Sequence, residues 1–206
     1  METISVKNLD GAYEQCSSLV NHIYGDGVTL LDNLVNIIKN LKRDWIGSDA
    51  SVHINNLYGV YKDLHSILSE AKGYVCFAGS RRIAMQQVRS ANGGSGNIGD
   101  YLKSEELASV MLSESEPTDV FDVKPAALSD LEDLKAACED YSKFMEKFFS
   151  VRYELMTNWT AGARREQAQK CFEELAVKSA SYRKILTEAK DNLAIAVRNI
   201  NELHNQ

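Results

Sequence analysis

The chain has 206 residues, of which 44% are hydrophobic and 25% are charged, and its formal net charge is −6. This length allows one domain, or two small ones, with a proper apolar core. Nucleic-acid-binding proteins normally carry a basic surface, so the acidic balance argues against that class. No stretch reaches the ~18 apolar residues of a membrane span, and we therefore expect no membrane insertion.

The first part of the chain predicts a helical hairpin. Between residues 5 and 43, large apolar residues recur at alternating steps of three and four, which is the pattern of a helix with one apolar face. A second stripe of this kind runs from residue 50 to residue 78. We expect two long helices, with a kink or local weakening of the first near Gly25 and Gly27.

The stretch between these two stripes, residues 44–48, has the sequence Asp-Trp-Ile-Gly-Ser and predicts the elbow of the hairpin. Gly47 permits the backbone conformation that a sharp reversal requires, and Ser48 can cap the second helix. The indole of Trp45 is a large apolar group that can fill the gap between the two diverging helices. Trp45 and Gly47 are therefore candidate site residues.

The composition changes between residues 92 and 122. Residues 92–99 are rich in glycine, which predicts a flexible linker. The spelling Gly-x-Gly-x-x-Gly within them lacks the preceding strand that a dinucleotide site requires. We consider a short amphipathic helix around residues 101–112. We expect a first hairpin at 1–91, a linker at 92–122 and a second hairpin at 123–206.

The second half repeats the plan of the first. A helical stripe returns after residue 126 and stops at a second elbow, Asn-Trp-Thr-Ala-Gly at residues 158–162, before a final stripe. Trp159 follows Trp45 after 114 residues, and the segment Ile-Leu-Thr-Glu-Ala-Lys at 185–190 follows Ile-Leu-Ser-Glu-Ala-Lys after 118. These offsets predict a tandem duplication of one helix–elbow–helix unit. Two unrelated hairpins remain the alternative interpretation.

With Trp45 and Gly47 in one elbow, and Trp159 and Gly162 in the other, the sequence resembles the WXG family of type VII secretion proteins. Members are small helical hairpins with Trp-x-Gly between two long helices, and they associate as antiparallel pairs in a four-helix bundle. The second elbow here carries one extra residue. The resemblance implies an all-α fold in which two antiparallel helical hairpins form one elongated four-helix bundle, as a fused version of the family's dimer.

The resemblance also implies how the chain is recognised. Partner proteins of the family carry an export signal, Tyr-x-x-x-Asp/Glu, after the second helix, and Tyr101 and Glu105 match that spelling shortly after the first hairpin. The implied partners are the type VII secretion machinery or another WXG-like protein, with self-association as a further option. The expected function is that of a type VII substrate or accessory protein. A cytoplasmic helical-bundle adaptor or scaffold is the alternative.

The N-terminus lacks the basic and apolar regions of a secretory signal peptide. We therefore expect synthesis in the cytoplasm and, if the resemblance holds, export to the medium or the cell surface by a route that is independent of such a signal.

The sequence contains no pattern typical of catalysis, a cofactor or a metal ion. No glutamate is followed by histidine three positions later, as a di-iron bundle would require, and the histidines form no close ligand pair. We expect these histidines at surface or boundary positions: His22, His53, His65 and His204. The widely spaced cysteines are expected in the core. We predict no enzyme activity, no cofactor and no metal site.

Overall fold

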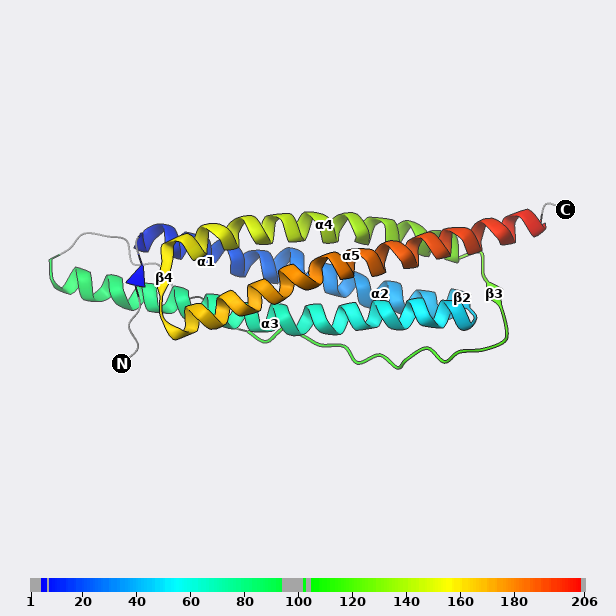
Figure 1. Ribbon diagram of the computed structural model, residues 1–206, viewed down its shortest axis with the longest axis horizontal. Helices are drawn as coiled ribbons and strands as arrows, with labels where there is room; N and C mark the ends of the chain where they lie inside the picture. Colours follow the sequence, from blue (N-terminus) through cyan, green and yellow to red (C-terminus); the bar gives the residue numbers. More distant parts are fainter. Residues whose placement is uncertain (1–4, 7, 94–101, 103–104, 205–206) are drawn as a thin grey trace. The chain divides into compact units, whose positions relative to one another are not determined.

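The computed structural model describes residues 5–6, 8–93, 102 and 105–204 of an all-α helical bundle, which confirms the predicted fold class (Figure 1). The predicted glycine-rich linker at 94–99 lies outside these residues. The elements in chain order are β1 (Ser5–Val6), α1 (Leu9–His22), η1 (Ile23–Gly27), α2 (Val28–Asp44), β2 (Trp45–Ile46), α3 (Ser48–Ala91), β3 (Asp122–Val123), α4 (Ala127–Asn158), β4 (Trp159–Ala161) and α5 (Ala163–His204).

The internal contacts divide the chain into two compact units. Unit 1 comprises Met1–Val28, Ser66–Leu107 and Phe144–Val177. Unit 2 comprises Thr29–His65, Ala108–Lys143 and Lys178–Gln206. The units do not coincide with the two hairpins, because each unit takes helical segments from both of them.

The predicted stripes form the core of each unit. Buried core side chains of unit 1 include Cys16, Leu19, Ile23, Leu68, Val75, Phe148, Phe172 and Leu175. Those of unit 2 include Leu34, Ile38, Leu41, Ile54, Leu57, Leu64, Leu134, Tyr141 and Leu193. Complete burial of one such side chain contributes about 1.5–3 kcal/mol relative to exposure, so these stripes are the main stabilising term of each unit.

The first long helix is interrupted where the two glycines predict it. α1 ends at His22, the five residues Ile23–Gly27 form a π-helix, and α2 begins at Val28. Gly27 also permits a close approach, because a Cβ there would lie 3.1 Å from Cε2 of Phe144. The glycines weaken the α-helical ladder, and the wider π-turn accommodates the local change in backbone hydrogen bonding.

Both elbows have the backbone that the glycines predict. Gly47 has φ = +147° and Gly162 has φ = +123°. The carbonyl of Gly47 accepts a hydrogen bond of 3.0 Å from the amide of Ser51, which opens α3. The prediction that Ser48 caps this helix is wrong: Ser48 is its first residue, and the hydroxyl donates to the carbonyl of Thr118 at 2.9 Å instead.

Each elbow pairs with the residues that precede the first helix of the other hairpin. In unit 2, β2 is antiparallel to β3, with Trp45 opposite Val123. In unit 1, β4 is antiparallel to β1, with Trp159 opposite Val6. The β1–β4 register shifts by one residue. The extra residue of the second elbow is therefore accommodated as a bulge, and the rest of the pairing repeats the first elbow.

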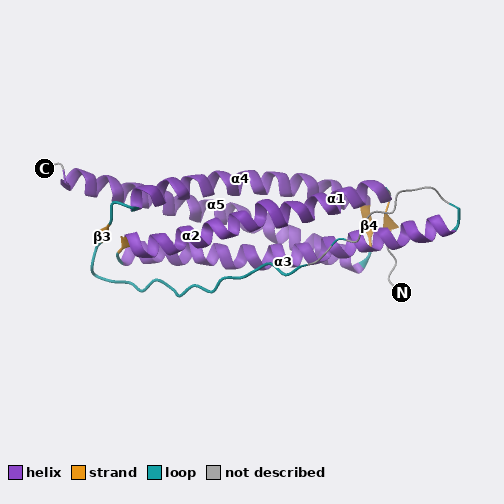
Figure 2. Ribbon diagram, turned by 180° about the vertical axis from the view of Figure 1, so that it is seen from behind, coloured by secondary structure: helices purple, strands orange, loops and turns teal. Residues whose placement is uncertain are grey.

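Residues 105–121 of the linker form no helix, so the short helix considered around residues 101–112 is absent from residues 105–112. In unit 2 the linker is an extended segment beside α3 (Figure 2). Asn55 of α3 holds the linker at Ser115, and Tyr58 holds it at Leu112. Polar side chains of the helix thus replace the internal hydrogen bonds that a helical linker would have made.

The elbow glycine allows a matched pair of substitutions. We expect Gly47→Ala to lower the free energy of unfolding by about 1–3 kcal/mol, because Ala tolerates positive φ poorly and its Cβ would lie 3.4 Å from the Phe121 ring. Gly59→Ala, within α3 and with nothing within 4 Å of the added Cβ, should instead raise it by up to about 1 kcal/mol. Urea denaturation measures both; a loss in the Gly59 variant as large as that in the Gly47 variant would contradict the assignment.

Candidate functional site

The first elbow combines a buried indole with an exposed apolar surface. Trp45 is only 4% exposed and stacks on the His53 ring at 5.6 Å between centroids. It thus fills the closed end of the hairpin, as the sequence predicted. Beside it lies an open pocket of about 310 Å³. Its lining consists of Trp45, Gly47, Ser48, Asp49, Ala50, Thr118, Asp119, Val120 and Phe121.

The linker end of this pocket carries large apolar side chains that face solvent. Val120 is 64% exposed and Phe121 is 61% exposed. The charged side chains in the lining are both acidic, Asp49 and Asp119. An exposed aromatic residue next to a pocket is a feature of surfaces that contact other proteins. We call this surface, Trp45 to Ala50 with Thr118 to Phe121, the elbow-1 surface.

A buried carboxyl pair lies directly behind the elbow-1 surface. Asp44 and Asp130 are 2% and 3% exposed, and a hydrogen bond joins their carboxyl groups. Asp44 also accepts from Nε of Arg43 at 3.0 Å, and its carbonyl accepts from the amide of Lys124 at 2.9 Å. Oδ2 of Asp130 is buried and has no hydrogen-bond partner among the described residues.

The two carboxyl groups differ in acidity because their surroundings differ. Hydrogen bonds from Arg43 hold the pKa of Asp44 below its ordinary value, and the charges of Arg43 and Lys124 act in the same direction. Burial raises the pKa of Asp130, and the neighbouring charge of Asp44 raises it further. As pH falls, Asp130 therefore takes up a proton before Asp44 does.

The second elbow is stabilised by hydrogen bonds from an arginine. Trp159 is 2% exposed, and its carbonyl accepts a hydrogen bond of 2.5 Å from Nε of Arg165. The Arg165 guanidinium also donates to Gln169 one turn further along α5, at 2.8 Å. Gly162 lies between Trp159 and Arg165 in the chain, and its carbonyl accepts a hydrogen bond of 3.0 Å from the amide of Arg165. The arginine thus joins the elbow backbone to the first turns of α5.

The structure describes one of the two residues of the predicted export signal. Tyr101 lies outside the described residues, so its position relative to Trp159 is not assigned. Glu105 is exposed, and its main-chain carbonyl accepts hydrogen bonds from the Tyr24 hydroxyl and from the Lys72 ammonium group. The backbone at Glu105 is thus fixed to unit 1, while its carboxylate remains at the surface.

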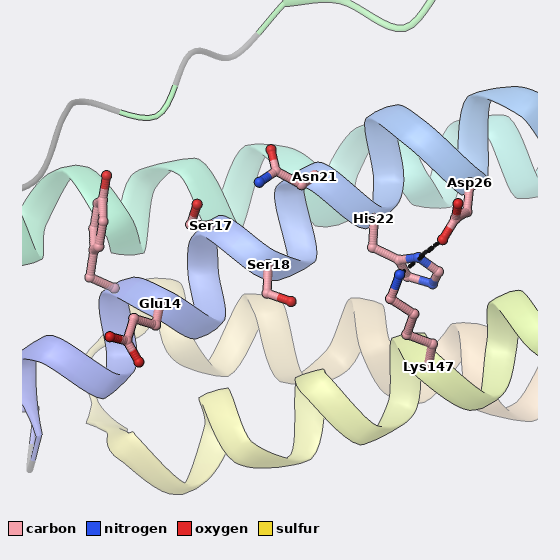
Figure 3. A pocket seen from close by; sticks show the side chains of 8 residues that line it. Glu14, Ser17, Ser18, Asn21, His22, Asp26 and Lys147 are labelled. Carbon is pink, nitrogen blue, oxygen red and sulfur yellow. Dashed lines mark hydrogen bonds and ion pairs between the residues drawn. The ribbon is translucent and has the colours of Figure 1, made fainter.

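A third site was not predicted from the sequence. It is an open polar pocket of about 500 Å³ in unit 1 (Figure 3). Its lining consists of Tyr13, Glu14, Ser17, Ser18, Asn21, His22, Asp26 and Lys147. The expected surface position is wrong for His22, which is 3% exposed. His22 and Asp26 are spaced i, i+4 beside two glycines, which is the signal that could have indicated this site.

His22 is held on three sides. Its Nδ1 lies 2.7 Å from Oδ2 of Asp26, its Nε2 lies 2.9 Å from the carbonyl oxygen of Phe144, and its ring stacks on Phe144 at 4.5 Å. Asp26 also accepts from Lys147 at 3.0 Å, and the hydrogen bonds from Lys147 and then His22 lower its pKa. Both ring nitrogens thus lie within hydrogen-bond distance of an oxygen acceptor.

Two of the cysteines are buried core groups. Burial raises the pKa of the Cys16 and Cys171 thiols to about 12, so both remain protonated core groups rather than nucleophiles. No group of three metal-ligating side chains occurs among the residues that the structure describes. None of the helices in that part of the chain is long and apolar enough to cross a membrane.

Comparison of the chain with protein-family models, with curated proteins and with solved structures gives no match.

The carboxyl pair predicts a pH-dependent stability. Because the folded-state pKa of Asp130 is raised, its contribution is fully present below the unfolded carboxyl pKa and is lost as pH rises through the raised value. We expect Asp130→Asn to be more stable than the wild type at neutral pH, with a difference that shrinks on acidification. Exposed Asp32→Asn in α2 is the control, since Asp32 is not among the groups that shift the pKa of Asp130. Urea denaturation from about pH 4 to about pH 8 checks this; a constant difference would refute it.

The polar pocket predicts a structural role for His22. We expect His22→Phe to keep the stacking on Phe144 but to lower the free energy of unfolding by about 1–3 kcal/mol, because the Phe144 carbonyl loses a buried donor. Asn21→Ala, at an exposed neighbouring position, should change it by no more than about 0.5 kcal/mol. Equal urea midpoints for the wild type and the His22 variant would contradict this role.

Proposed function

We propose that this chain is a non-enzymatic protein associated with type VII secretion, a substrate or an accessory, that acts by protein–protein recognition. It would be a single-chain counterpart of a WXG hairpin pair. The observation that carries the proposal is the repeated strand pairing: Trp45 opposite Val123, and Trp159 opposite Val6. Each elbow is closed by the residues before the first helix of the other hairpin.

This pairing supports the idea of a fused pair for a physical reason. An elbow at the end of a hairpin exposes main-chain donors and acceptors that need partners. In a separate hairpin, those partners would come from a second protein or from water. Here Ser5–Val6 and Asp122–Val123 supply them from the same chain. Covalent linkage also raises the effective concentration of one hairpin for the other.

The alternative function is that of a cytoplasmic helical-bundle adaptor or scaffold. It is favoured by the elbow-1 surface, where Val120 and Phe121 are exposed beside a pocket. Such a surface can dock another protein without any export. The two functions therefore differ in where the protein is found and in whether Tyr101 and Glu105 are needed.

Export is the measurement that separates these functions. In a bacterium with a type VII secretion system, we expect the tagged chain in the culture medium. We expect about tenfold less of it after Tyr101→Ala, because recognition would lose an aromatic contact. Tyr153→Ala is the matched control, since Tyr153 is 71% exposed and belongs to neither motif. Immunoblots of medium and cells give the amounts.

An isogenic strain with the secretion machinery disabled provides the second control. Extracellular protein in that strain at the level of the intact strain would indicate lysis. Retention of the chain inside the cells of both strains, with normal folding by circular dichroism, would reject the secretion proposal in favour of the adaptor.

A further inference from the structure

The linker in unit 2 is held almost entirely through its main chain. The Tyr61 hydroxyl accepts a hydrogen bond from the amide of Val110 at 2.7 Å, and the Tyr58 hydroxyl accepts one from the amide of Leu112 at 3.1 Å. Both tyrosines come from α3 and are spaced by three residues, so they present their hydroxyl groups on one face of that helix.

Asn55, three residues before Tyr58, makes a two-point contact on the same face. Its Oδ1 accepts from the amide of Ser115 at 2.7 Å, and its Nδ2 donates to the carbonyl of Ser115 at 3.0 Å. A neighbouring β-strand would satisfy both groups of one residue in the same manner. Ser48 extends the row by donating to the carbonyl of Thr118 at 2.9 Å.

α2 contributes one further side chain that contacts this part of the linker. The Lys42 ammonium group donates to the carbonyl oxygens of Ser113 and Glu114 at 2.8 and 3.2 Å, and to the Ser113 hydroxyl at 2.7 Å. The residues of α2 and α3 that form these hydrogen bonds with the linker are Lys42, Ser48, Asn55, Tyr58 and Tyr61. We call this set the linker groove.

The side chains of the linker contribute little to its attachment. Among residues 105–121, all of which the structure describes, Leu107 is the one buried side chain, and Met111 is 92% exposed. Each hydrogen bond between a helix side chain and the linker backbone contributes only a small net free energy, whereas ordering the extended backbone has an entropic cost at every residue. Val110 and Leu112 are half-buried, and release of this part of the linker would uncover Tyr58 and Tyr61 while leaving the helices α2 and α3 folded.

The charges indicate what the groove accepts. Residues 105–121 contain five acidic side chains and no lysine or arginine. The groove presents Lys42, and Lys62 lies over the ring of Tyr58 at 4.5 Å. Lys42 and Lys62 thus place positive charge beside an acidic, extended segment, and Lys42 contacts carbonyl and hydroxyl oxygens of that segment. The hydrogen bonds of Asn55 and the two tyrosines are made to its backbone rather than to its side chains.

We propose that the linker groove is a binding site for an extended acidic peptide segment of a partner protein, and that the chain's own linker occupies this site until such a segment replaces it. The proposal concerns α2 and α3 of unit 2, and it does not depend on export.

A displaced linker makes the groove testable in the full-length chain. Val110→Pro with Leu112→Pro removes the two amides that Tyr61 and Tyr58 accept, while proline and the residue before it still favour extended backbone. A fluorescent synthetic peptide of residues 105–119 should bind this variant about tenfold more tightly than the wild type, measured by anisotropy, because the tethered linker no longer competes.

Two controls assign the binding to the groove. A peptide with proline at the positions of Val110 and Leu112 should bind at least about tenfold more weakly. Adding Tyr58→Phe and Tyr61→Phe to the proline variant should weaken binding of the unmodified peptide by a similar factor, since the rings remain but the hydroxyl groups do not. Equal binding of the two peptides, or no effect of the tyrosine substitutions, would overturn the proposal.

Hydrogen exchange of the wild-type chain tests the same point if the proline variant does not fold. The amides of Val110, Leu112 and Ser115 should exchange at least about 100-fold faster than that of Tyr61, because release of the linker needs no global unfolding. Equal protection would overturn the proposal. A stable wild-type dimer by light scattering that exchanges linkers between copies would also overturn it, by assigning the groove to a second copy.

Discussion

Each elbow must bury a tryptophan and must also satisfy the hydrogen-bonding groups of its backbone. The strand bridges β2–β3 and β1–β4 allow both. A tryptophan can fill the closed end of a hairpin only if it is buried, and Trp45 and Trp159 are 4% and 2% exposed. Its burial removes the adjoining backbone from water, so the amide and carbonyl groups there need partners. Pairing with Val123 and Val6 supplies those partners without adding another helix or loop.

The helices depend on these bridges because long helices gain little stability from propensity alone. Their apolar stripes must be buried against other segments, and the pairing of Trp45 with Val123 determines where α4 begins relative to the elbow. The carboxyl pair lies at the same point: Asp44 ends α2, and Asp130 lies in the first turn of α4. The two interacting carboxyl groups thus connect the end of α2, next to the elbow, with the first turn of α4.

The features set by local chemistry could be predicted from the sequence. Apolar spacing predicted the helices, and glycine predicted the elbows at Gly47 and Gly162 and the interruption near Gly27. The burial of His22 could not be predicted, because its acceptor at Phe144 lies 122 residues away. The linker contacts were missed for a similar reason: Tyr58 and Tyr61 occupy core positions of the stripe, and only the fold shows that their hydroxyl groups reach the linker.

The position of each stripe also restricts how this chain can bind another protein. Apolar faces of the hairpins are already buried within their units, so a partner that inserted a helix between them would have to break that packing first. Binding at the elbow-1 surface or at the linker would not require this packing to be broken. Phe121 and Met111 are already exposed, and the linker is held by polar contacts. A partner that bound these segments would leave the helical cores in place and could exchange hydrogen bonds with the linker one at a time.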